Sequence, residues 1–254
     1  MEKPVSTTII GIDLAWGERN PDGISVLEFP DGLEASSLSV RCGLAHGDEE
    51  LLEQLLSTKS DQVFVAIDAP TLGTNETGSR PVDRECSRLF RKQEAGCHPV
   101  NRTLCTRPFR VAEKLLGAGF VLSADLRKGH RLAAEVYPHP AMVRLFGLEK
   151  TIKYKRSPVA NRRTEFSRYQ DCFRNFVAAH LPSLAGTGEF HQITSLPWNK
   201  NNEDKLDSLF CAAIGWWHLR FDGKRSQVLG DEESGQMLIP RSPKDFPVSH
   251  SVRA

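Results

Sequence analysis

The sequence predicts an α/β protein built on one mixed five-stranded sheet with helices on both faces. Three β-type runs separated by turns open the chain, and alternating strand and helix patterns follow them. The length of 254 residues suits one large domain. We expect this domain to span residues 1–240. The polar segment 241–254 is expected to be a flexible tail.

The first half of the chain supplies four strands and one helix. Thr8–Trp16 is an apolar, β-branched run, and Ile24–Phe29 and Leu33–Arg41 follow it across turns, which predicts a meander. Leucines at helical spacing in Leu51–Leu56, behind an acidic first turn, predict an amphipathic helix. Gln62–Asp68 is nearly all apolar, as expected of a strand covered on both faces. A right-handed crossover places this strand parallel to the first.

The second half supplies most of the helices. Arg80–Gly119 predicts two helices separated by a loop at Gly96–Pro108. Arg131–Tyr137 is the fifth strand, because Pro138 stops it and Pro140 suits the start of a following helix. The chain then continues with a helix at Arg162–Leu181, a loop at Pro182–Asn202 and a long helix at Glu203–Phe221. A short C-terminal hairpin, with strands Gln227–Leu229 and Met237–Ile239, completes it.

Composition and charge exclude several classes of protein. Charged residues make up 26% and hydrophobic residues 39%, so we expect neither a disordered nor a fibrous protein. The longest apolar runs are far shorter than the about 20 residues that cross a bilayer. No signal-peptide pattern is visible, so we expect a cytoplasmic protein without membrane contacts. The net charge of +1 gives no overall attraction for nucleic acid, and any polyanion site must be a local patch.

The six cysteines form no C-x-x-C pair, which predicts reduced and mostly buried thiols rather than a disulfide scaffold. A zinc site made from Cys86, Cys97, His98 and Cys105 is the alternative. Zinc sites usually show paired short spacings, and these residues match no such pattern. The sequence therefore favours thiols over zinc ligands.

Carboxylates in the apolar strands are the most informative feature of the sequence. Asp13 lies in the first strand, Asp68 ends the fourth, and Glu135 lies in the fifth. The carboxyl ends of parallel strands meet at one edge of a sheet, where open α/β sheets bind ligands. Asp204 and Asp207, three residues apart, project from one face of the last long helix. Two such groups 4 Å apart repel by about 4 kcal/mol at an effective dielectric constant near 20, and a divalent cation removes that repulsion.

Each acid also has an ordinary structural interpretation. Asp68 suits an Asx turn, Asp204 suits the first turn of a helix, and Glu135 suits an ion pair with Arg131 on the same strand face. Taken together, in a sheet of this order, the acids favour a function. Two divalent ions held by several carboxylates can clamp the attacking and leaving oxygens of a phosphodiester.

Six motifs, in the same order, resemble an uncharacterised family of predicted ribonuclease H-like nucleases catalogued as a domain of unknown function. The motifs are Gly11-Ile-Asp-Leu-Ala-Trp-Gly17, Ile67-Asp-Ala-Pro70, Arg80-Pro-Val-Asp-Arg-Glu85, Glu135-Val-Tyr-Pro-His139, Glu203-Asp-Lys-Leu-Asp-Ser-Leu-Phe-Cys-Ala-Ala213 and Gly230-Asp-Glu-Glu-Ser-Gly-Gln-Met-Leu-Ile-Pro240. The resemblance covers most of the chain, from Thr8 to Pro240. It implies a ribonuclease H-like fold, with insertions at about 80–130 and 150–200, and a nuclease that uses two metal ions.

The resemblance also implies roles for individual residues. Asp13 and Asp68 bind Mg²⁺ or Mn²⁺, and Asp207, together with Asp204, completes the metal site from the helix. Asp13, Asp68 and Asp207 are then catalytic. Glu135 is the expected further catalytic acid, although it lies beyond a long insertion relative to minimal ribonuclease H domains.

Nucleic acid as a substrate also requires cations that contact its phosphates. Two groups of basic residues are candidates: Arg80, Arg84 and Arg88 at about one helical turn, and Lys153, Lys155 and Arg156 in a segment without acids. A solvated helix face has the same pattern, so both interpretations stand.

Two other functions compete with a nuclease. A phosphotransferase of the sugar-kinase and actin type shares the strand order, but Trp16 stands where its small-residue phosphate loop is expected. The chain is also too short for the two domains usual in that class. The second competitor is a catalytically silent binding module, and the retained acids argue against it, because clustered charge lowers stability unless it is used.

Overall fold

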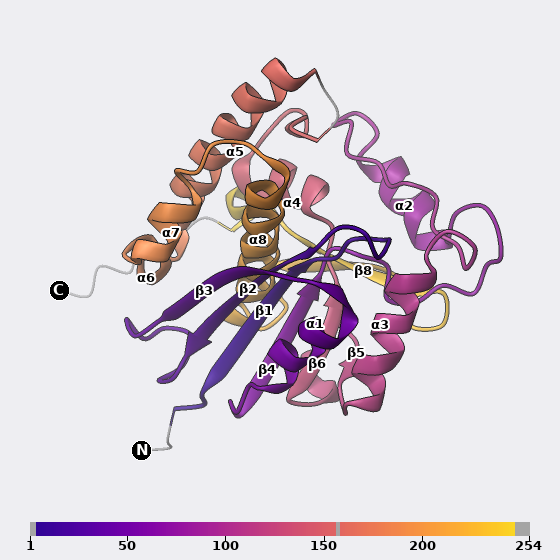
Figure 1. Ribbon diagram of the computed structural model, residues 1–254, viewed down its shortest axis with the longest axis horizontal. Helices are drawn as coiled ribbons and strands as arrows, with labels where there is room; N and C mark the ends of the chain where they lie inside the picture. Colours follow the sequence, from indigo (N-terminus) through magenta and orange to yellow (C-terminus); the bar gives the residue numbers. More distant parts are fainter. Residues whose placement is uncertain (1–3, 156–157, 247–254) are drawn as a thin grey trace.

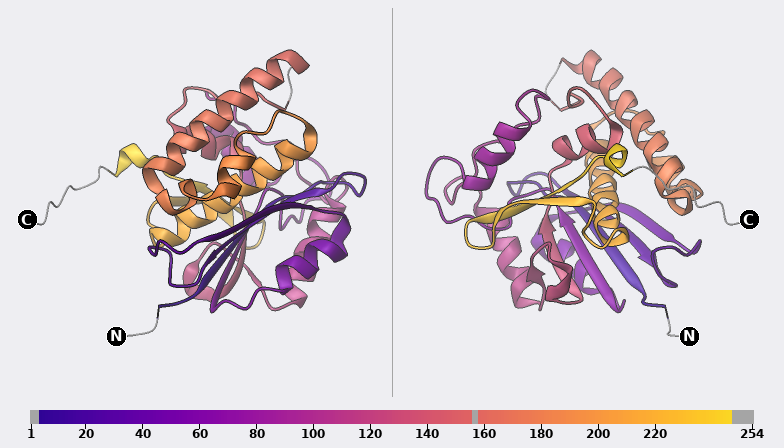
Figure 2. Two further views of the ribbon diagram at one scale, coloured as in Figure 1. Left: turned by 60° about the vertical axis from the view of Figure 1, so that its left-hand side comes forward. Right: turned by 180° about the vertical axis from the view of Figure 1, so that it is seen from behind.

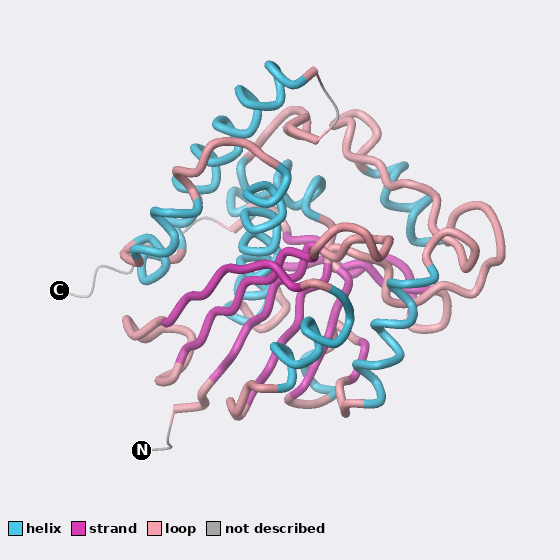
Figure 3. The backbone as a smooth tube through the Cα atoms, viewed as in Figure 1, coloured by secondary structure: helices cyan, strands magenta, loops and turns pink. Residues whose placement is uncertain are grey.

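A mixed sheet lies between two layers of helices in the computed structural model, which describes residues 4–155 and 158–246 (Figures 1 and 3). The sheet has six strands in the order β3-β2-β1-β4-β6-β5, with β2 antiparallel to its two neighbours and the other pairs parallel. Its strands are β1 Thr7–Asp13, β2 Asp22–Phe29, β3 Ser39–Ala45, β4 Gln62–Ile67, β5 Val121–Leu122 and β6 Arg131–Glu135. A separate antiparallel hairpin consists of β7 Ser226–Asp231 and β8 Gly235–Pro240.

The central strands alternate their side chains between two cores, because successive residues of a strand point to opposite faces. Ile10 and Val65 belong to the core on the side of α1 (Gly47–Leu56) and α3 (Thr106–Gly117). Ile9 and Phe64 belong to the core on the side of α8, with α4 and α5 further out (Figure 2). The remaining helices are α2 Pro81–Leu89, α4 Pro138–Phe146, α5 Val159–His180, α6 Pro182–Ala185, α7 Gly188–Ile193 and α8 Lys200–Arg220.

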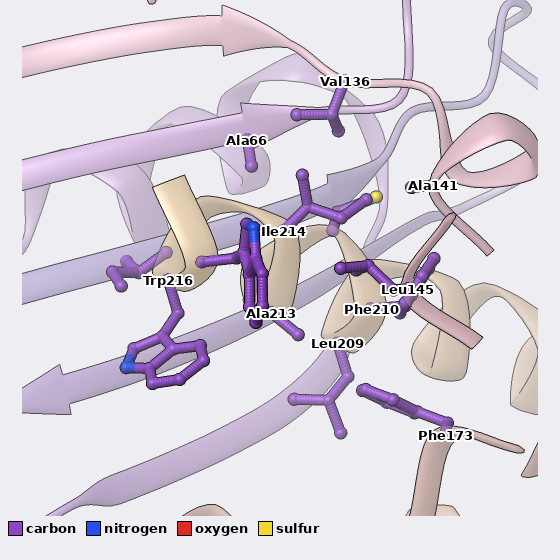
Figure 4. Packing of buried hydrophobic residues seen from close by; sticks show 14 of the residues in the cluster. Ala66, Val136, Ala141, Leu145, Phe173, Leu209, Phe210, Ala213, Ile214 and Trp216 are labelled. Atoms are coloured by element: carbon purple, nitrogen blue, oxygen red, sulfur yellow. The ribbon is translucent and has the colours of Figure 1, made fainter. Parts of the chain in front are cut away.

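Two glycines let the long helix α8 lie directly on the strands. A Cβ atom at Gly11 would stand 2.0 Å from the backbone oxygen of Ser208, and one at Gly23 would stand 2.0 Å from the backbone oxygen of Asp204. Any side chain at either position would therefore push the helix away. Buried α8 residues fill the core between this helix, the sheet and α5 (Figure 4). This packing fixes the start of α8 beside the ends of β1 and β2.

The expected α/β class, mixed sheet and C-terminal hairpin are confirmed, but several details were wrong. The third strand is Ser39–Ala45 rather than Leu33–Arg41. The sheet has a sixth strand, β5, whose two residues are too few to show a periodic pattern. The expected loop 182–202 contains the short helices α6 and α7. The first strand ends at Asp13 rather than Trp16, and the chain then turns away from the sheet.

Two further expectations concern the ends of the fold and membranes. Of the expected tail 241–254, residues Pro243–Asp245 form a 3₁₀ turn, and residues 247–254 lie outside the described part. No helix within residues 4–155 and 158–246 is both long and apolar enough to traverse a bilayer.

Candidate functional site

Four aspartates from three elements gather at the carboxyl edge of the sheet, and we call them the aspartate cluster. Asp13 is the last residue of β1, and Asp68 directly follows β4. The amide of Asp68 donates to the carbonyl oxygen of Ile12 at 2.8 Å, so β1 and β4 end side by side. Asp204 and Asp207 are buried in the first turns of α8. The close packing of α8 on Gly11 and Gly23 therefore carries these two side chains to the strand ends.

Lys155 lies next to three members of the aspartate cluster, Asp13, Asp68 and Asp207. Its Nζ is 2.8 Å from Asp207 Oδ2 and 3.8 Å from Asp13 Oδ1. Its charge also opposes the rise that burial causes in the pKa of Asp68. The Tyr154 hydroxyl donates to the other oxygen of Asp207 at 2.7 Å. Asp207 is thus held on both oxygens, and one lysine serves several carboxylates at once.

Lys200 supplies a second cation at the edge of the aspartate cluster. It pairs with Asp204 Oδ1 and, at 3.2 Å, with Glu203 Oε1. The second oxygen of Asp204 is buried and accepts no hydrogen bond from any of the described residues. Four aspartates against two lysines leave two negative charges in excess when all six groups are ionised, and Lys200 is further shared with Glu203.

The excess of carboxylates changes their titration. Burial and the neighbouring Asp13 together raise the pKa of Asp204 to about 8, against the opposing charge of Lys200. Burial likewise raises the pKa of Asp207 to about 6, opposed by Lys155 and reinforced by Asp13. The pKa of Asp68 is raised well above its ordinary value, mainly by burial and also by Asp13 and Asp207. Protons or an added cation must therefore compensate this cluster.

A pocket of about 570 Å³ opens over the aspartate cluster, and Asp13, Asp68 and Asp204 line it together with Lys155 and Lys200. This is the size of ordinary small-molecule sites. Other lining residues come from the segment after β1, the loop after α2, the start of α4 and the segment before α5: Trp16, Glu94, His98, Tyr137, His139, Thr151 and Lys153. The acids thus lie in a walled pocket rather than on an open sheet edge.

Glu135 belongs to a different group, the Arg80 network, formed by Arg80, Asp83 and Glu135. Its Cα pairs with Ile67, one residue before Asp68, so the alternation of side chains directs it to the sheet face opposite Asp68. The guanidinium of Arg80 binds both oxygens of Glu135, at 2.6 and 2.8 Å, and also binds Asp83 at 2.8 Å. The expected role of Glu135 as a catalytic acid is not supported by this geometry, and neither is its expected pairing with Arg131.

The expected basic residues have different positions. Arg80 is only 1% exposed and is occupied by the Arg80 network, so it is wrong as a phosphate contact. Arg84 and Arg88 are exposed on α2. Lys153 is exposed, lines the pocket and pairs with Glu94, whereas Arg156 lies outside the described residues.

The contacts of two lysines in this site, Lys200 and Lys155, were not expected from the sequence. Lys200 could have been found, because its i, i+4 spacing to Asp204 on a helix predicts an ion pair. The position of Lys155 could not, because it depends on how the segment before α5 folds over the sheet edge.

No three His, Cys, Asp or Glu side chains among residues 4–155 and 158–246 already form a ligand set for one ion. In the aspartate cluster, the ammonium group of Lys155 lies beside both Asp13 and Asp207. Cys86, Cys97, His98 and Cys105 likewise form no such ligand set within the described residues. All six cysteines are free thiols, as the sequence predicts.

Comparison with known proteins gives one match. A family model described as "Protein of unknown function (DUF429)" matches residues 11–234. The matched span includes all four members of the aspartate cluster and both of its lysines. Neither the curated proteins nor the solved structures contain a match to the chain.

Proposed function

The chain belongs to the DUF429 family, and we propose that it is a divalent-metal-dependent phosphodiesterase that hydrolyses nucleic acid. One observation carries the proposal: Asp13, Asp68 and Asp204 line a pocket, the buried Asp207 joins them through Lys155, and the four carry more negative charge than Lys155 and Lys200 neutralise. Buried carboxylates that only support a fold normally have all their oxygens satisfied by hydrogen bonds or ion pairs. An excess of carboxylates at a ligand-sized pocket favours a site built for a cation.

The donor atoms fit a hard divalent ion. Mg²⁺ and Mn²⁺ prefer carboxylate oxygens, and the aspartate cluster offers only such oxygens. The buried, unpartnered Oδ2 of Asp204 is the kind of atom that a metal ligand leaves when the ion is absent. Asp13 and Asp204 would hold the first ion, because the two carboxylates lie close enough for Asp13 to raise the pKa of Asp204.

Lys155 determines how many ions the site accepts. Its ammonium lies where an ion shared by Asp13 and Asp207 would lie. The two-ion site implied by the resemblance of the sequence therefore requires Lys155 to leave this position. After such a move Lys155 would face the pocket, where its charge binds the phosphate of a substrate.

The residues of the chain have separate tasks in the proposed reaction. Tyr154 orients Asp207 through its hydroxyl, and Lys200 orients Asp204. Lys153, at the pocket wall, adds positive charge on the side where a phosphate enters. A bound divalent ion supplies the remaining chemistry, because it polarises the phosphodiester and lowers the pKa of a bound water.

The arrangement of strands supports a ribonuclease H-like assignment within this proposal. The order β3-β2-β1-β4-β6 combines an antiparallel three-strand meander with parallel strands added beyond β1. Acids at the ends of β1 and β4 and on the last long helix correspond to the pattern that the six sequence motifs imply.

Cleavage assays with purified protein, Mn²⁺ and labelled DNA, RNA, hybrid and branched substrates test the proposal. We expect cleavage that Asp13→Asn reduces by more than about a hundredfold, since even outer-shell partners of a metal contribute 10- to 100-fold. Asp171→Asn on α5 is the matched control, because Asp171 is exposed and pairs only with Arg174. It should cleave at the wild-type rate.

A second measurement separates metal binding from catalysis. Mn²⁺ should raise the melting temperature of the wild type and of Asp171→Asn, but not that of Asp13→Asn. Cleavage that survives Asp13→Asn would place the activity elsewhere or in a contaminant. Turnover of ATP with a small acceptor would replace the nuclease with a phosphotransferase, and absence of both metal binding and turnover would favour a binding module.

A further inference from the structure

The pocket over the aspartate cluster is closed by segments that the sheet does not supply. Its floor comes from the ends of β1 and β4 and from α8, whereas its walls come from the segment after β1, the loop after α2 and the segment around Thr151–Lys155. The last two wall segments belong to the insertions expected from the sequence at about 80–130 and 150–200. The insertions therefore convert an edge of the sheet into a pocket.

Buried and short-range contacts hold the wall after β1 in place. Arg107 of α3 is only 3% exposed, and its guanidinium donates to Asp22 at 2.6 and 2.8 Å and to the carbonyl oxygen of Ala15. The amide of Ala15 also donates to Asp22 at 2.8 Å. These bonds fix the backbone on which Trp16 stands, so this wall is preformed.

The opposite wall is fixed in a similar way. The Tyr137 hydroxyl donates to the carbonyl oxygen of Gly96 at 2.9 Å, which ties the loop after α2 to the start of α4. Glu94 in the same loop pairs with both Lys150 and Lys153. With both walls tied to the body of the protein, an occupant of the pocket must fit the space that already exists.

Trp16 gives this space an aromatic surface. Its side chain lines the pocket three residues after Asp13 and is 38% exposed, whereas Trp216 and Trp217 are buried in the core and Trp198 is half-buried. An exposed tryptophan on a preformed wall is the usual platform on which an unstacked base binds. A volume of about 570 Å³ is enough for one nucleotide.

We infer that the substrate is single-stranded nucleic acid, with one nucleotide seated in the pocket and its base stacked on Trp16. This inference rests on the proposed function and specifies its substrate. In a duplex the bases are stacked and paired, so a nucleotide reaches such a pocket only after extrusion. A single strand presents unstacked bases without that requirement. The phosphate of the seated nucleotide then lies over the aspartate cluster.

Binding of fluorescein-labelled 12-mers, measured by anisotropy in the presence of Ca²⁺, tests the inference. The probes are a single-stranded DNA, a single-stranded RNA of the same base sequence, and the same DNA strand annealed to its complement. We expect at least one single strand to bind about tenfold tighter than the duplex, because only the duplex must unstack a base. Trp16→Ala should weaken that binding about tenfold, and Trp16→Phe should retain most of it.

Leu104→Ala is the matched control. Leu104 is also an exposed apolar side chain, at 56%, and it does not line the pocket. This variant should bind like the wild type, and circular dichroism spectra should show that all three variants are folded. Unchanged affinity of Trp16→Ala, or equal affinity for single strand and duplex, overturns the inference.

The outcome for cleavage separates this inference from the proposed function. If Mn²⁺-dependent cleavage requires Asp13 but proceeds equally well on duplex and single strand, the proposed function stands and the single-strand inference is wrong. If no probe binds and no substrate is cleaved, both are wrong. The proposed function and the inference are both supported if the wild type and Leu104→Ala cleave single strands preferentially and Trp16→Ala loses that preference.

Discussion

The Arg80 network and the aspartate cluster both contain carboxylates sequestered from solvent, but different cations neutralise them. In the Arg80 network one guanidinium binds both oxygens of Glu135, contacts Asp83 and donates to the backbone oxygen of Leu72. In the aspartate cluster two lysines serve four aspartates, and one oxygen of Asp204 has no hydrogen-bond donor within residues 4–155 and 158–246. The first group is fully satisfied by the protein alone, and the second is not.

This difference separates structural carboxylates from candidate functional ones. Arginine presents a rigid, planar set of donors that matches a carboxylate and remains charged at any working pH. Lysine is a compact point charge on a flexible chain, so it can move when another cation or a phosphate arrives. We therefore expect the Arg80 network to control stability and the aspartate cluster to control ligand binding.

The largest expected effect is on stability and comes from Arg80→Ala. The variant leaves Glu135 and Asp83 buried without a cation, which should lower the free energy of unfolding by about 3–5 kcal/mol. Urea unfolding followed by circular dichroism measures this change. Arg84→Ala, exposed in the first turn of the same helix, should change the free energy by less than about 0.5 kcal/mol. A small effect of Arg80→Ala would mean that the network is not structural.

The pattern of apolar runs in the sequence predicted most of the fold, but it could not assign Glu135. Whether this residue joins the aspartate cluster depends on its pairing with Ile67 rather than with Asp68. A shift of one residue moves a side chain to the other face of a sheet, and nothing in a single sequence specifies that register. Arg80 could not be assigned from the sequence either. Its helical spacing from Arg84 and Arg88 predicted three exposed arginines on one helix face, whereas Arg80 is buried.

The position of the two α8 aspartates was more predictable than that of Lys155. Asp204 and Asp207 share one face of a helix because of their spacing, and Gly11 allows that helix to approach β1. Lys155 follows a segment without regular secondary structure, and Tyr154 beside it is buried against Asp207. Long-range packing of this kind leaves no periodic pattern in the sequence.

An intermediate effect is expected on metal affinity from Lys155→Met. Removing the ammonium group removes the competitor for the space between Asp13 and Asp207. Isothermal titration with Mn²⁺ should show binding at least about tenfold tighter than in the wild type, a gain of about 1.4 kcal/mol. The Lys153→Met variant, exposed at the pocket wall, serves as the control and should change the affinity much less. Weaker binding by Lys155→Met would show that Lys155 organises the ligands instead of competing with the ion.

The last expected effect is a pH-dependent gain of stability in metal-free Asp204→Asn. The folded protein raises the pKa of Asp204 from 3.8 to about 8, so between these values the folded state binds a proton that the unfolded state releases. The resulting stabilisation is complete below pH 4 and is lost as the pH rises toward 8. Asparagine does not ionise, so the variant lacks this loss of stability between pH 4 and pH 8. The lost ion pair with the half-exposed Lys200 contributes little to stability.

Asp204→Asn should therefore melt higher than the wild type at pH 8, by about 2–4 °C for each kcal/mol of repulsion removed, and no higher at pH 4. Differential scanning calorimetry from pH 4 to pH 8, with Asp171→Asn as the exposed control, measures both ends of this range. Saturating Mn²⁺ at pH 8 should cancel the advantage, because the ion neutralises the wild-type cluster and has fewer ligands in the variant. If Asp204→Asn melts lower than the wild type at pH 8, Lys200 alone satisfies Asp204, and the two groups of buried carboxylates differ less than their geometry indicates.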